Sequence, residues 1–219
     1  MCGRYNLHSS KEVRVLMSSI GMPDFVPPER FNIAPTESVP VVIEREGQRV
    51  VQDARWWLTP SWSGGPSTKY AMFNARSETL ATSRAFKAPF KQQRCMIPAS
   101  SFIEWQTIDG IKQPFDVKLS GSAMAFAGLW DVWHGGDEPL YSCTIVTTDA
   151  GDNFKHIHKR APVMLQGEAL DTWLNPETQA AELRPLMQSR SEHIFEIEAI
   201  DRAIGNSRNK AAPVKLNVK

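Results

Sequence analysis

The feature that most restricts the fold is a series of short runs of β-branched and aromatic residues, separated by turn residues, that begins at Val39. The first two runs, PVVIE and RVVQDARWWL, flank the turn signal EGQ and predict a β-hairpin. The strongest turn signal in the chain, Asp109-Gly110, lies between residues 101–108 and 111–119 and predicts a second hairpin. A third strand pair is expected around residues 134–137, which read HGGD.

Helical periodicity is confined to a few segments. Apolar residues recur at helical spacing over Ser9–Ile20, where Ser9 and Glu12 have the spacing of a capping box. Residues 78–86 are also expected to be helical. Two further helices are expected in the segments EALDTWL and AELRPLM, the second interrupted by Pro185.

The order of these elements indicates the fold class. A last strand is expected at residues 194–200, and strands do not alternate regularly with helices as a parallel α/β fold requires. No stretch rich in Pro, Gly or Ser is long enough to join two domains. The sequence therefore predicts one α+β domain over residues 1–219, built on antiparallel sheet.

Charge and cysteine content exclude several classes of protein. Lys and Arg total 25 against 24 Asp and Glu, so binding to an acidic polymer would depend on local cations and not on a global field. The three cysteines, Cys2, Cys95 and Cys143, lack CxxC spacing, which argues against a disulfide framework and a four-ligand zinc site. Without a signal peptide or an apolar run of membrane-spanning length, we expect a soluble, cytoplasmic protein.

Cys2 directly follows the initiator methionine. A small residue at this position permits removal of Met1, and Cys2 would then carry a free α-amine beside its thiol. With a pKa of ~7.8, about a tenth of such an amine is neutral at pH 7, against well under a thousandth of a lysine amine. An aldehyde would therefore react with the amine to give an imine, and the thiol could add to the same carbon to close a thiazolidine ring.

Eight short motifs extend this observation across most of the chain. In order, they are MCGRY, FNIAPT, WWLTPSW, FNARSET with TSRAF, PASSFIEW, TIVTTDAG, HIHKRAPVML and AIGNSRN. Together they resemble the SRAP family, the SOS response-associated peptidases, whose members sense and shield abasic sites in single-stranded DNA. The resemblance implies a single domain with a barrel-like antiparallel sheet and flanking helices. It also implies a monomer that binds single-stranded DNA containing abasic sites, without metal or cofactor, in the cytoplasm and at the nucleoid.

The resemblance implies roles for particular residues. Cys2 would be the nucleophile that forms the imine and thiazolidine, with Asn74 holding the cysteine and the opened sugar in register. Glu104 and His158 would be the acid and base groups. The implied phosphate ligands are Arg4, Arg76, Arg84 and Arg160, and bases would be splayed apart at Pro35 and Trp105. The chain departs from the family pattern at Trp57, Ser100-Ser101 and Ala161, which would reshape the rim of the site.

Two other functions remain open on the sequence. Cys2, His158 and Glu104 could form the nucleophile, base and orienting group of a thiol peptidase or autopeptidase. Alternatively, the arginines and the cluster of Trp56, Trp57 and Trp62 could belong to a non-catalytic module that binds single-stranded DNA. The HxH pair of His156 and His158 supplies only two ligands on one face of an extended segment, so no metal site is expected. His156, His8, His134 and His193 are interpreted as structural or surface residues.

Overall fold

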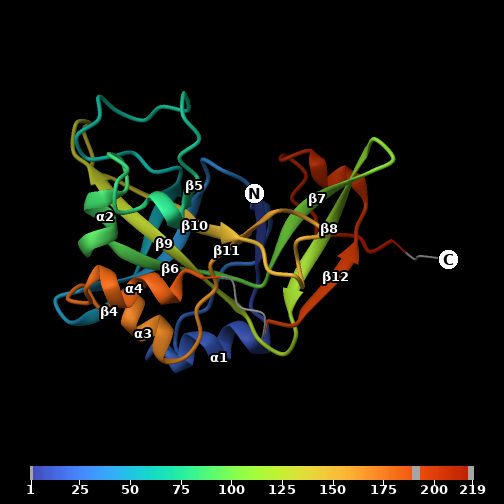
Figure 1. Ribbon diagram of the computed structural model, residues 1–219, viewed down its shortest axis with the longest axis horizontal. Coiled ribbons are helices and arrows are strands. Elements are labelled where there is room, and N and C mark those ends of the chain that lie inside the picture. The colour runs from blue at the N-terminus through green and yellow to red at the C-terminus, as the bar shows by residue number, and fades with distance from the viewer. Residues whose placement is uncertain (1, 189–192, 217–219) are drawn as a thin grey trace.

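The structure is a computed structural model and describes residues 2–188 and 193–216 (Figure 1). Two sheets make up its frame. The first has the strand order β12-β8-β7-β1-β2, and its strands, in chain order, are β1 (Arg4–Leu7), β2 (Arg30–Ile33), β7 (Ser101–Ile108), β8 (Ile111–Leu119) and β12 (Phe195–Ala199).

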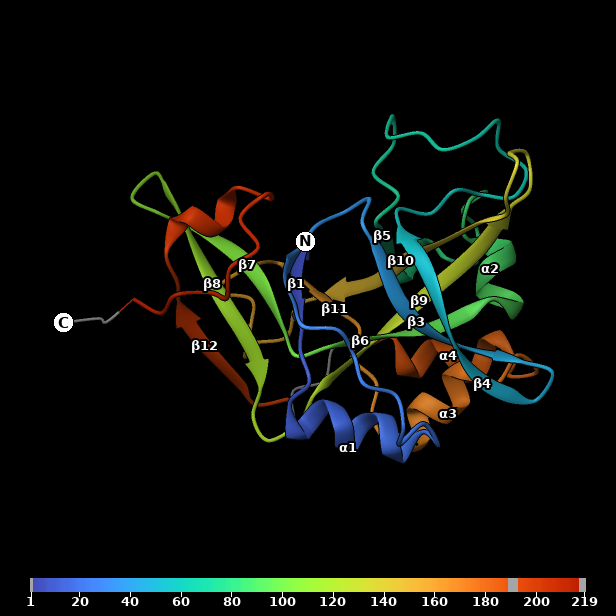
Figure 2. The same cartoon turned by 180° about the vertical axis from the view of Figure 1, so that it is seen from behind.

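The second sheet closes into a five-stranded barrel because β10 pairs with both β4 and β9 (Figures 1 and 2). Its strands are β3 (Ser38–Arg45), β4 (Gln48–Trp56), β6 (Arg94–Ala99), β9 (Met124–Trp133) and β10 (Leu140–Asp149). Two short strands, β5 (Asn74–Arg76) and β11 (Arg160–Pro162), pair with the second half of β10. The predicted α+β class and barrel-like sheet are confirmed, although β10 pairs in parallel with β4 and β5.

The predicted hairpins are confirmed. β7 and β8 flank Asp109-Gly110, whose φ angles are +48° and +77°. β3 and β4 flank Glu46-Gly47, with φ angles of +53° and +74°. Positive φ at both central residues is what a type I′ turn requires, and its twist matches that of the flanking strands. β9 and β10 lie on either side of residues 134–139, also as predicted.

The helices match the predictions in part. α1 (Lys11–Ser19) is capped by Ser10, whose hydroxyl accepts a hydrogen bond from the Val13 amide, so the prediction of Ser9 as the cap is wrong. α3 (Glu168–Leu174) and α4 (Ala180–Leu186) form as predicted. Pro185 lies inside the last turn of α4 and does not interrupt it. β12 lies within one residue, at each end, of the strand predicted at 194–200.

The helix predicted at residues 78–86 is wrong. This segment holds only a 3₁₀ turn, η1 (Ser77–Thr79), and α2 (Lys87–Gln92) begins where the prediction ended. The hydroxyls of Thr79 and Thr82 donate to the backbone carbonyls three residues earlier, and such bonds compete with regular helix formation. A second 3₁₀ helix, η2 (Arg202–Gly205), follows β12.

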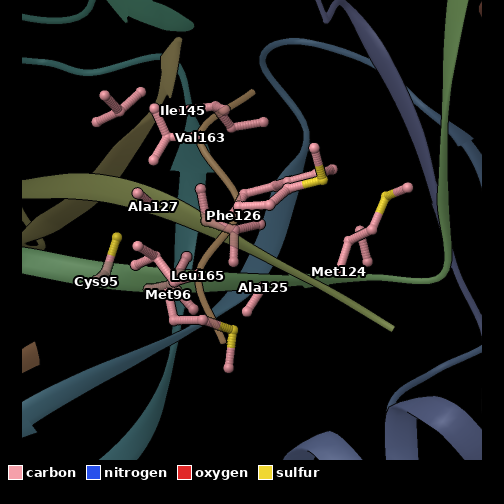
Figure 3. Packing of buried hydrophobic residues seen from close by; sticks show 14 of the residues in the cluster. Cys95, Met96, Met124, Ala125, Phe126, Ala127, Ile145, Val163 and Leu165 are labelled. Atoms are coloured by element: carbon pink, nitrogen blue, oxygen red, sulfur yellow. The ribbon is translucent and has the colours of Figure 1, made fainter. Parts of the chain in front are cut away.

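One core of buried apolar side chains joins the two sheets, and Figure 3 shows the part around β6 and β9. Phe126 of β9 meets the rings of Tyr5 in β1 and Phe102 in β7 edge-on, each with a centroid separation of 6.2 Å. Buried polar contacts also fix β1. The Asn6 side chain donates from Nδ2 to Ser101 Oγ and accepts at Oδ1 from the backbone amide of Asn32. β1 therefore belongs to the first sheet and lies at its boundary with the barrel (Figure 2). No helix among the described residues is long and apolar enough to cross a membrane.

Candidate active site

Cys2 lies buried just before β1, and its neighbour in space is Asn74. The Asn74 side-chain amide donates a hydrogen bond of 2.9 Å to the Cys2 carbonyl across 72 sequence positions. Asn74 reaches this position because it begins β5, which pairs with β10 opposite Ile145. Its side-chain oxygen, Oδ1, is buried and has no hydrogen-bond partner among the described residues. The site therefore contains an acceptor that faces no donor from the described part of the chain.

Glu104 is the acidic group whose charge acts on the Cys2 thiol. It lies in β7, next to Ile103, which pairs with Arg4 of β1, and its side chain is only 4% exposed. Burial raises the pKa of the Cys2 thiol far above its ordinary value, and the charge of Glu104 raises it further. One carboxylate oxygen of Glu104 accepts from the Trp105 amide at 3.1 Å. The structure thus brings Cys2, Asn74 and Glu104 together.

His158 lies on the segment that leads into β11 and is half-buried. Its Nδ1 is 3.0 Å from the Arg160 amide and 3.1 Å from the Arg160 carbonyl oxygen. A neutral ring can accept from the amide while carrying its proton on Nε2, and a protonated ring can donate from Nδ1 to the carbonyl. The same ring position therefore suits both protonation states, which is what an acid/base group needs. β11, which follows His158, and β5, which begins at Asn74, both pair with β10. The same strand therefore positions both residues.

The four arginines predicted to bind phosphate lie in different environments. Arg76 and Arg84 are exposed. Arg4 is half-buried, donates to the Gly3 carbonyl and has its guanidinium 6.0 Å from the centroid of the Trp105 ring. Burial lowers the pKa of Arg4. Arg160 is buried and donates to the carboxylates of Glu78 and Asp149 and to the Thr147 carbonyl.

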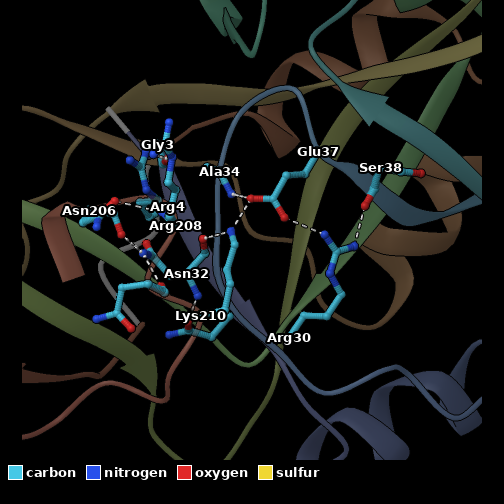
Figure 4. Close-up of polar contacts among 12 residues, drawn as sticks. Gly3, Arg4, Arg30, Asn32, Ala34, Glu37, Ser38, Asn206, Arg208 and Lys210 are labelled. Atoms are coloured by element: carbon cyan, nitrogen blue, oxygen red, sulfur yellow. Dashed lines mark hydrogen bonds and ion pairs between the residues drawn. The ribbon is translucent and has the colours of Figure 1, made fainter. Parts of the chain in front are cut away.

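Pro35 is half-exposed on the loop between β2 and β3, and a polar cluster fixes this loop (Figure 4). The Glu37 carboxylate accepts from the Ala34 amide at 2.8 Å and pairs with Arg30 at 2.7 Å. Lys210 also pairs with Glu37 and donates to the Asn32 carbonyl. The sequence analysis missed Asn32, Glu37 and Lys210, although asparagine is the non-glycine residue best suited to the positive φ of +50° at position 32.

The asparagine of this cluster ties it to the C-terminal part of the chain. Asn32 is buried, and its side-chain amide lies within hydrogen-bond distance of the carbonyls of Ile204, Asn206 and Asn209. Ile204 packs with Ile103, Ile200 and Trp105 in a small apolar cluster. The segment around the AIGNSRN motif therefore supports both the Pro35 loop and the Trp105 strand.

The structure also gives the positions of the clustered tryptophans and of the residues at which the chain departs from the family pattern. Trp56 is fully buried, Trp57 is half-buried against Phe73, and Trp62 is exposed with Arg84 above its ring. Ser101 Oγ accepts from the Asn6 side chain of β1, Ser100 Oγ accepts from the His8 amide just after β1, and Ala161 is buried in β11. Among the described residues, no group of three or more His, Cys, Asp or Glu side chains is placed to hold a metal ion.

Solved structures share this fold. A protein from Bacteroides thetaiotaomicron superposes with a TM-score of 0.76 and 21% identity over 96% of this chain and 100% of the other. A phage-related protein from Bordetella bronchiseptica gives a TM-score of 0.73 and 25% identity over 92% of this chain and 95% of the other.

Sequence comparison identifies relatives at higher identity. The abasic site processing protein YoaM of Bacillus subtilis is 34% identical over 97% of this chain and 96% of its own length. The abasic site processing protein HMCES of Gallus gallus is 33% identical over 66% of this chain and 53% of its own length. The family model described as SOS response associated peptidase (SRAP) matches residues 1–207. Because the family model matches residues 1–207 and YoaM is 34% identical over 97% of this chain, this protein belongs to the SRAP family.

Proposed function

We propose that this protein processes abasic sites in single-stranded DNA by bonding to them covalently through Cys2. The relatives named abasic site processing proteins supply the substrate class. The observation that carries the proposal is the buried position of Cys2 just before β1, where Asn74 bonds to its carbonyl and the charge of Glu104 acts on its thiol. In this proposal Met1 is removed, and the protein acts as a monomer on exposed single strands.

The reaction uses both nucleophiles of a processed Cys2. The α-amine attacks C1′ of the ring-opened sugar, and loss of water from the resulting carbinolamine gives an imine. The thiol sulfur then adds to the imine carbon, while the thiol proton is removed and the imine nitrogen gains one. The C=N bond becomes a C–N bond, a C–S bond forms, and the net products are a thiazolidine and one water molecule.

The protonation state of the thiol supports this order of steps. Because burial and the charge of Glu104 raise the pKa of the Cys2 thiol, the thiol is neutral near pH 7 and is a poor nucleophile. The amine therefore reacts first, and the thiol needs a base when the ring closes. In this proposal Glu104 is that base, and His158 takes up or releases protons during sugar opening and loss of water. The open acceptor on Asn74 suits the amine or a sugar hydroxyl.

The same thiol argues against the peptidase alternative. A cysteine peptidase attacks with a thiolate, whose formation needs a lowered pKa, whereas the pKa of Cys2 is raised.

Incubation with abasic single-stranded DNA, with and without borohydride, separates the candidate functions. The proposed function requires a covalent adduct, the peptidase requires cleaved peptide, and a non-catalytic binding module gives only salt-reversible retention.

Substitution of Cys2 tests the two steps separately. Cys2→Ser and Cys2→Ala keep the terminal amine but lose the thiol, so both variants are expected to lose the adduct that is stable without borohydride. They should retain an imine that borohydride traps, and strand cleavage by β-elimination should increase because the imine is no longer captured. Intact mass spectrometry must first confirm that Met1 is absent. Undiminished stable adduct in Cys2→Ala would assign the nucleophile to another residue.

A further inference from the structure

Two residues of the candidate site, Asn74 and His158, lie on segments that pair with opposite edges of β10. Thr147 of β10 pairs with Arg76 of β5 on one edge and with Pro162 of β11 on the other. β5 and β11 have three residues each, so each segment has only a short attachment to the barrel. A contact between the two segments across the end of β10 would therefore fix one relative to the other.

An ion pair between Glu78 and Arg160 makes this contact. Glu78 lies in η1, which directly follows β5 and so continues the segment of Asn74. Arg160 is the first residue of β11, directly after the segment of His158. Arg160 Nη1 donates to Glu78 Oε1 at 2.6 Å, and Arg160 Nη2 donates to Glu78 Oε2 at 3.0 Å. Two parallel bonds between a guanidinium and a carboxylate fix their orientation as well as their distance.

Glu78 is the carboxylate that holds the Arg160 side chain most firmly. Arg160 Nη1 also donates to Asp149 Oδ1 at 2.7 Å, but this bond uses one oxygen of a side chain that is 85% exposed. Exposed ion pairs of this kind contribute little to the position of either partner. The bond from Arg160 is also the largest cause that lowers the pKa of Glu78, so Glu78 carries its charge at neutral pH.

The backbone of Arg160 in turn orients the His158 ring. His158 Nδ1 lies 3.0 Å from the Arg160 amide nitrogen and 3.1 Å from the Arg160 carbonyl oxygen. A shift of Arg160 would move both of these groups, and with them the direction of the other ring nitrogen, Nε2. Such a shift matters for catalysis, because a displacement of about 1 Å caused at a distance from the chemistry can cost ~10²-fold in rate.

We propose that Glu78 is a positioning residue that holds His158 in place through Arg160. The inference rests on the proposed function, in which His158 takes up or releases protons during sugar opening and loss of water. Glu78 itself contacts neither Cys2 nor the abasic sugar in this proposal, and acts by tying Arg160 to the segment of Asn74. Loss of the ion pair should therefore slow formation of the imine without weakening the binding of DNA.

The test uses full-length processed protein and single-stranded oligonucleotides with one abasic site. The total adduct, stable and borohydride-trapped together, gives the rate of imine formation at each DNA concentration. Glu78→Gln keeps the size of the side chain, but its amide nitrogen cannot accept the second bond from Arg160. This variant should lower the maximal rate by up to about 100-fold without raising the half-saturating concentration.

Glu198→Gln is the matched control for Glu78→Gln. Glu198 pairs with Lys215 at 2.6 Å, and its side chain is 37% exposed, against 46% for Glu78. It lies in β12 of the first sheet, on a strand that carries no residue of the candidate site. Glu198→Gln should therefore keep the maximal rate of the parent, and an equal fall in this variant would refute a specific role of Glu78.

A second variant separates position from charge. Glu78→Asp keeps the charge that compensates the buried guanidinium, so circular dichroism should show it folded like the parent. A carboxylate that is one methylene shorter cannot maintain both bonds to Arg160, so the maximal rate should fall in this variant too. The full parent rate in Glu78→Asp would mean that only the charge matters, and would refute the positioning role.

A double-mutant cycle with His158 tests the route of the effect. In a protein that carries His158→Ala, Glu78→Gln should slow imine formation no further, because the group that Glu78 positions is absent. A change that acts on the fold in general would slow both backgrounds by the same factor. Additive effects in the cycle would therefore refute the inference.

The outcomes distinguish this inference from the proposed function. If the parent forms no adduct, the proposed function fails, and the inference fails with it. If the parent forms adduct but Glu78→Gln and Glu78→Asp keep its maximal rate, the inference alone is refuted. A raised half-saturating concentration at an unchanged maximal rate would likewise refute it, since Glu78 would then serve DNA binding through Arg160.

Discussion

The thiol of Cys2 and the carboxylate of Glu104 are both buried, and the carboxylate can act on the thiol in two opposite ways. The negative charge disfavours a thiolate and so raises the pKa of the thiol. The same carboxylate can remove a proton from the neutral thiol during ring closure. In the proposed reaction, Glu104 thus adds to the effect of burial, which keeps the thiol neutral at rest, and then acts as the base during ring closure.

Glu104→Gln should separate these effects. Removal of the charge should lower the pKa of the Cys2 thiol, which stays above its ordinary value because burial, the larger cause, remains. The rate of stable adduct formation should nevertheless fall ~10²–10⁴-fold, as is typical for loss of an acid/base group. Titration of ¹³C-labelled cysteine by nuclear magnetic resonance gives the pKa, and Glu196→Gln, at an exposed position of β12, is the matched control. A faster reaction in Glu104→Gln would show that Glu104 only suppresses the thiolate.

At the scale of elements, the hairpin turns connect local sequence to the position of the site. The Asp109-Gly110 turn sets the register of β7 against β8, and β7 carries Glu104 and Trp105. Gly110 has a φ of +77°, and a Cβ built there meets no atom within 4 Å. A side chain at Gly110 would therefore strain the backbone without a steric clash.

Gly110→Ala is expected to lower the free energy of unfolding by about 1 kcal/mol, because alanine tolerates the left-handed conformation poorly. Gly110→Asn should lose less, since asparagine adopts this conformation more readily. Urea denaturation measures both. Equal stability of Gly110→Ala and the parent would mean that the turn changes conformation, which amide exchange across β7 and β8 would detect.

Elements with strong local signals were the ones that the sequence predicted. The three hairpins and the helices α1, α3 and α4 follow from turn residues and periodicity within one segment. By contrast, β5 and β11 have three residues each and exist because β10 pairs with them. Three residues carry no recognisable period, so the sequence analysis did not identify either strand.

The candidate site was predicted by residue type more than by arrangement. The motifs identified Cys2, Asn74 and Glu104. Only in the folded chain does Asn74 of β5 bond to Cys2, before β1, and does the charge of Glu104 in β7 act on the Cys2 thiol. The burial of Arg160 between Glu78 and Asp149 and the contact of Lys210 with Glu37 join residues with no common local pattern. Such contacts are set by tertiary packing and leave no local signal in the sequence.

At the scale of the whole molecule, buried thiols link stability to pH. Burial raises the pKa values of Cys2, Cys95 and Cys143 in the folded protein. The folded state therefore holds thiol protons that the unfolded chain releases above about pH 8.5. Stability from this source is fully present below that pH and is lost as the pH rises towards the folded-state values.

The free energy of unfolding should accordingly fall above about pH 8.5, by up to ~1.4 kcal/mol per pH unit for each thiol. Urea denaturation between pH 7 and 10 measures this slope. Cys95→Ala and Cys143→Ala should each make it shallower, whatever their stability at pH 7. If both variants keep the parent slope, thiol ionisation is not its cause.

Initial binding to DNA depends on the distribution of charge over the surface, because the net charge is only +1. Each phosphate contact on a single strand contributes about −0.7 to the slope of log affinity against log salt concentration. Arg4, Arg76 and Arg84 together predict a slope of about −2, and a contact from Arg160 would bring it to about −3. Binding is measured with Cys2→Ala on single strands that carry no aldehyde, because these strands exclude both the stable adduct and the imine. Under these conditions Arg84→Ala should reduce the slope by about 0.7 and weaken binding equally for all sequences, since phosphates carry no base information. Arg160→Met decides whether the arginine paired with Glu78 and Asp149 also reaches DNA, and a slope near zero in the parent would remove all four arginines from the binding surface.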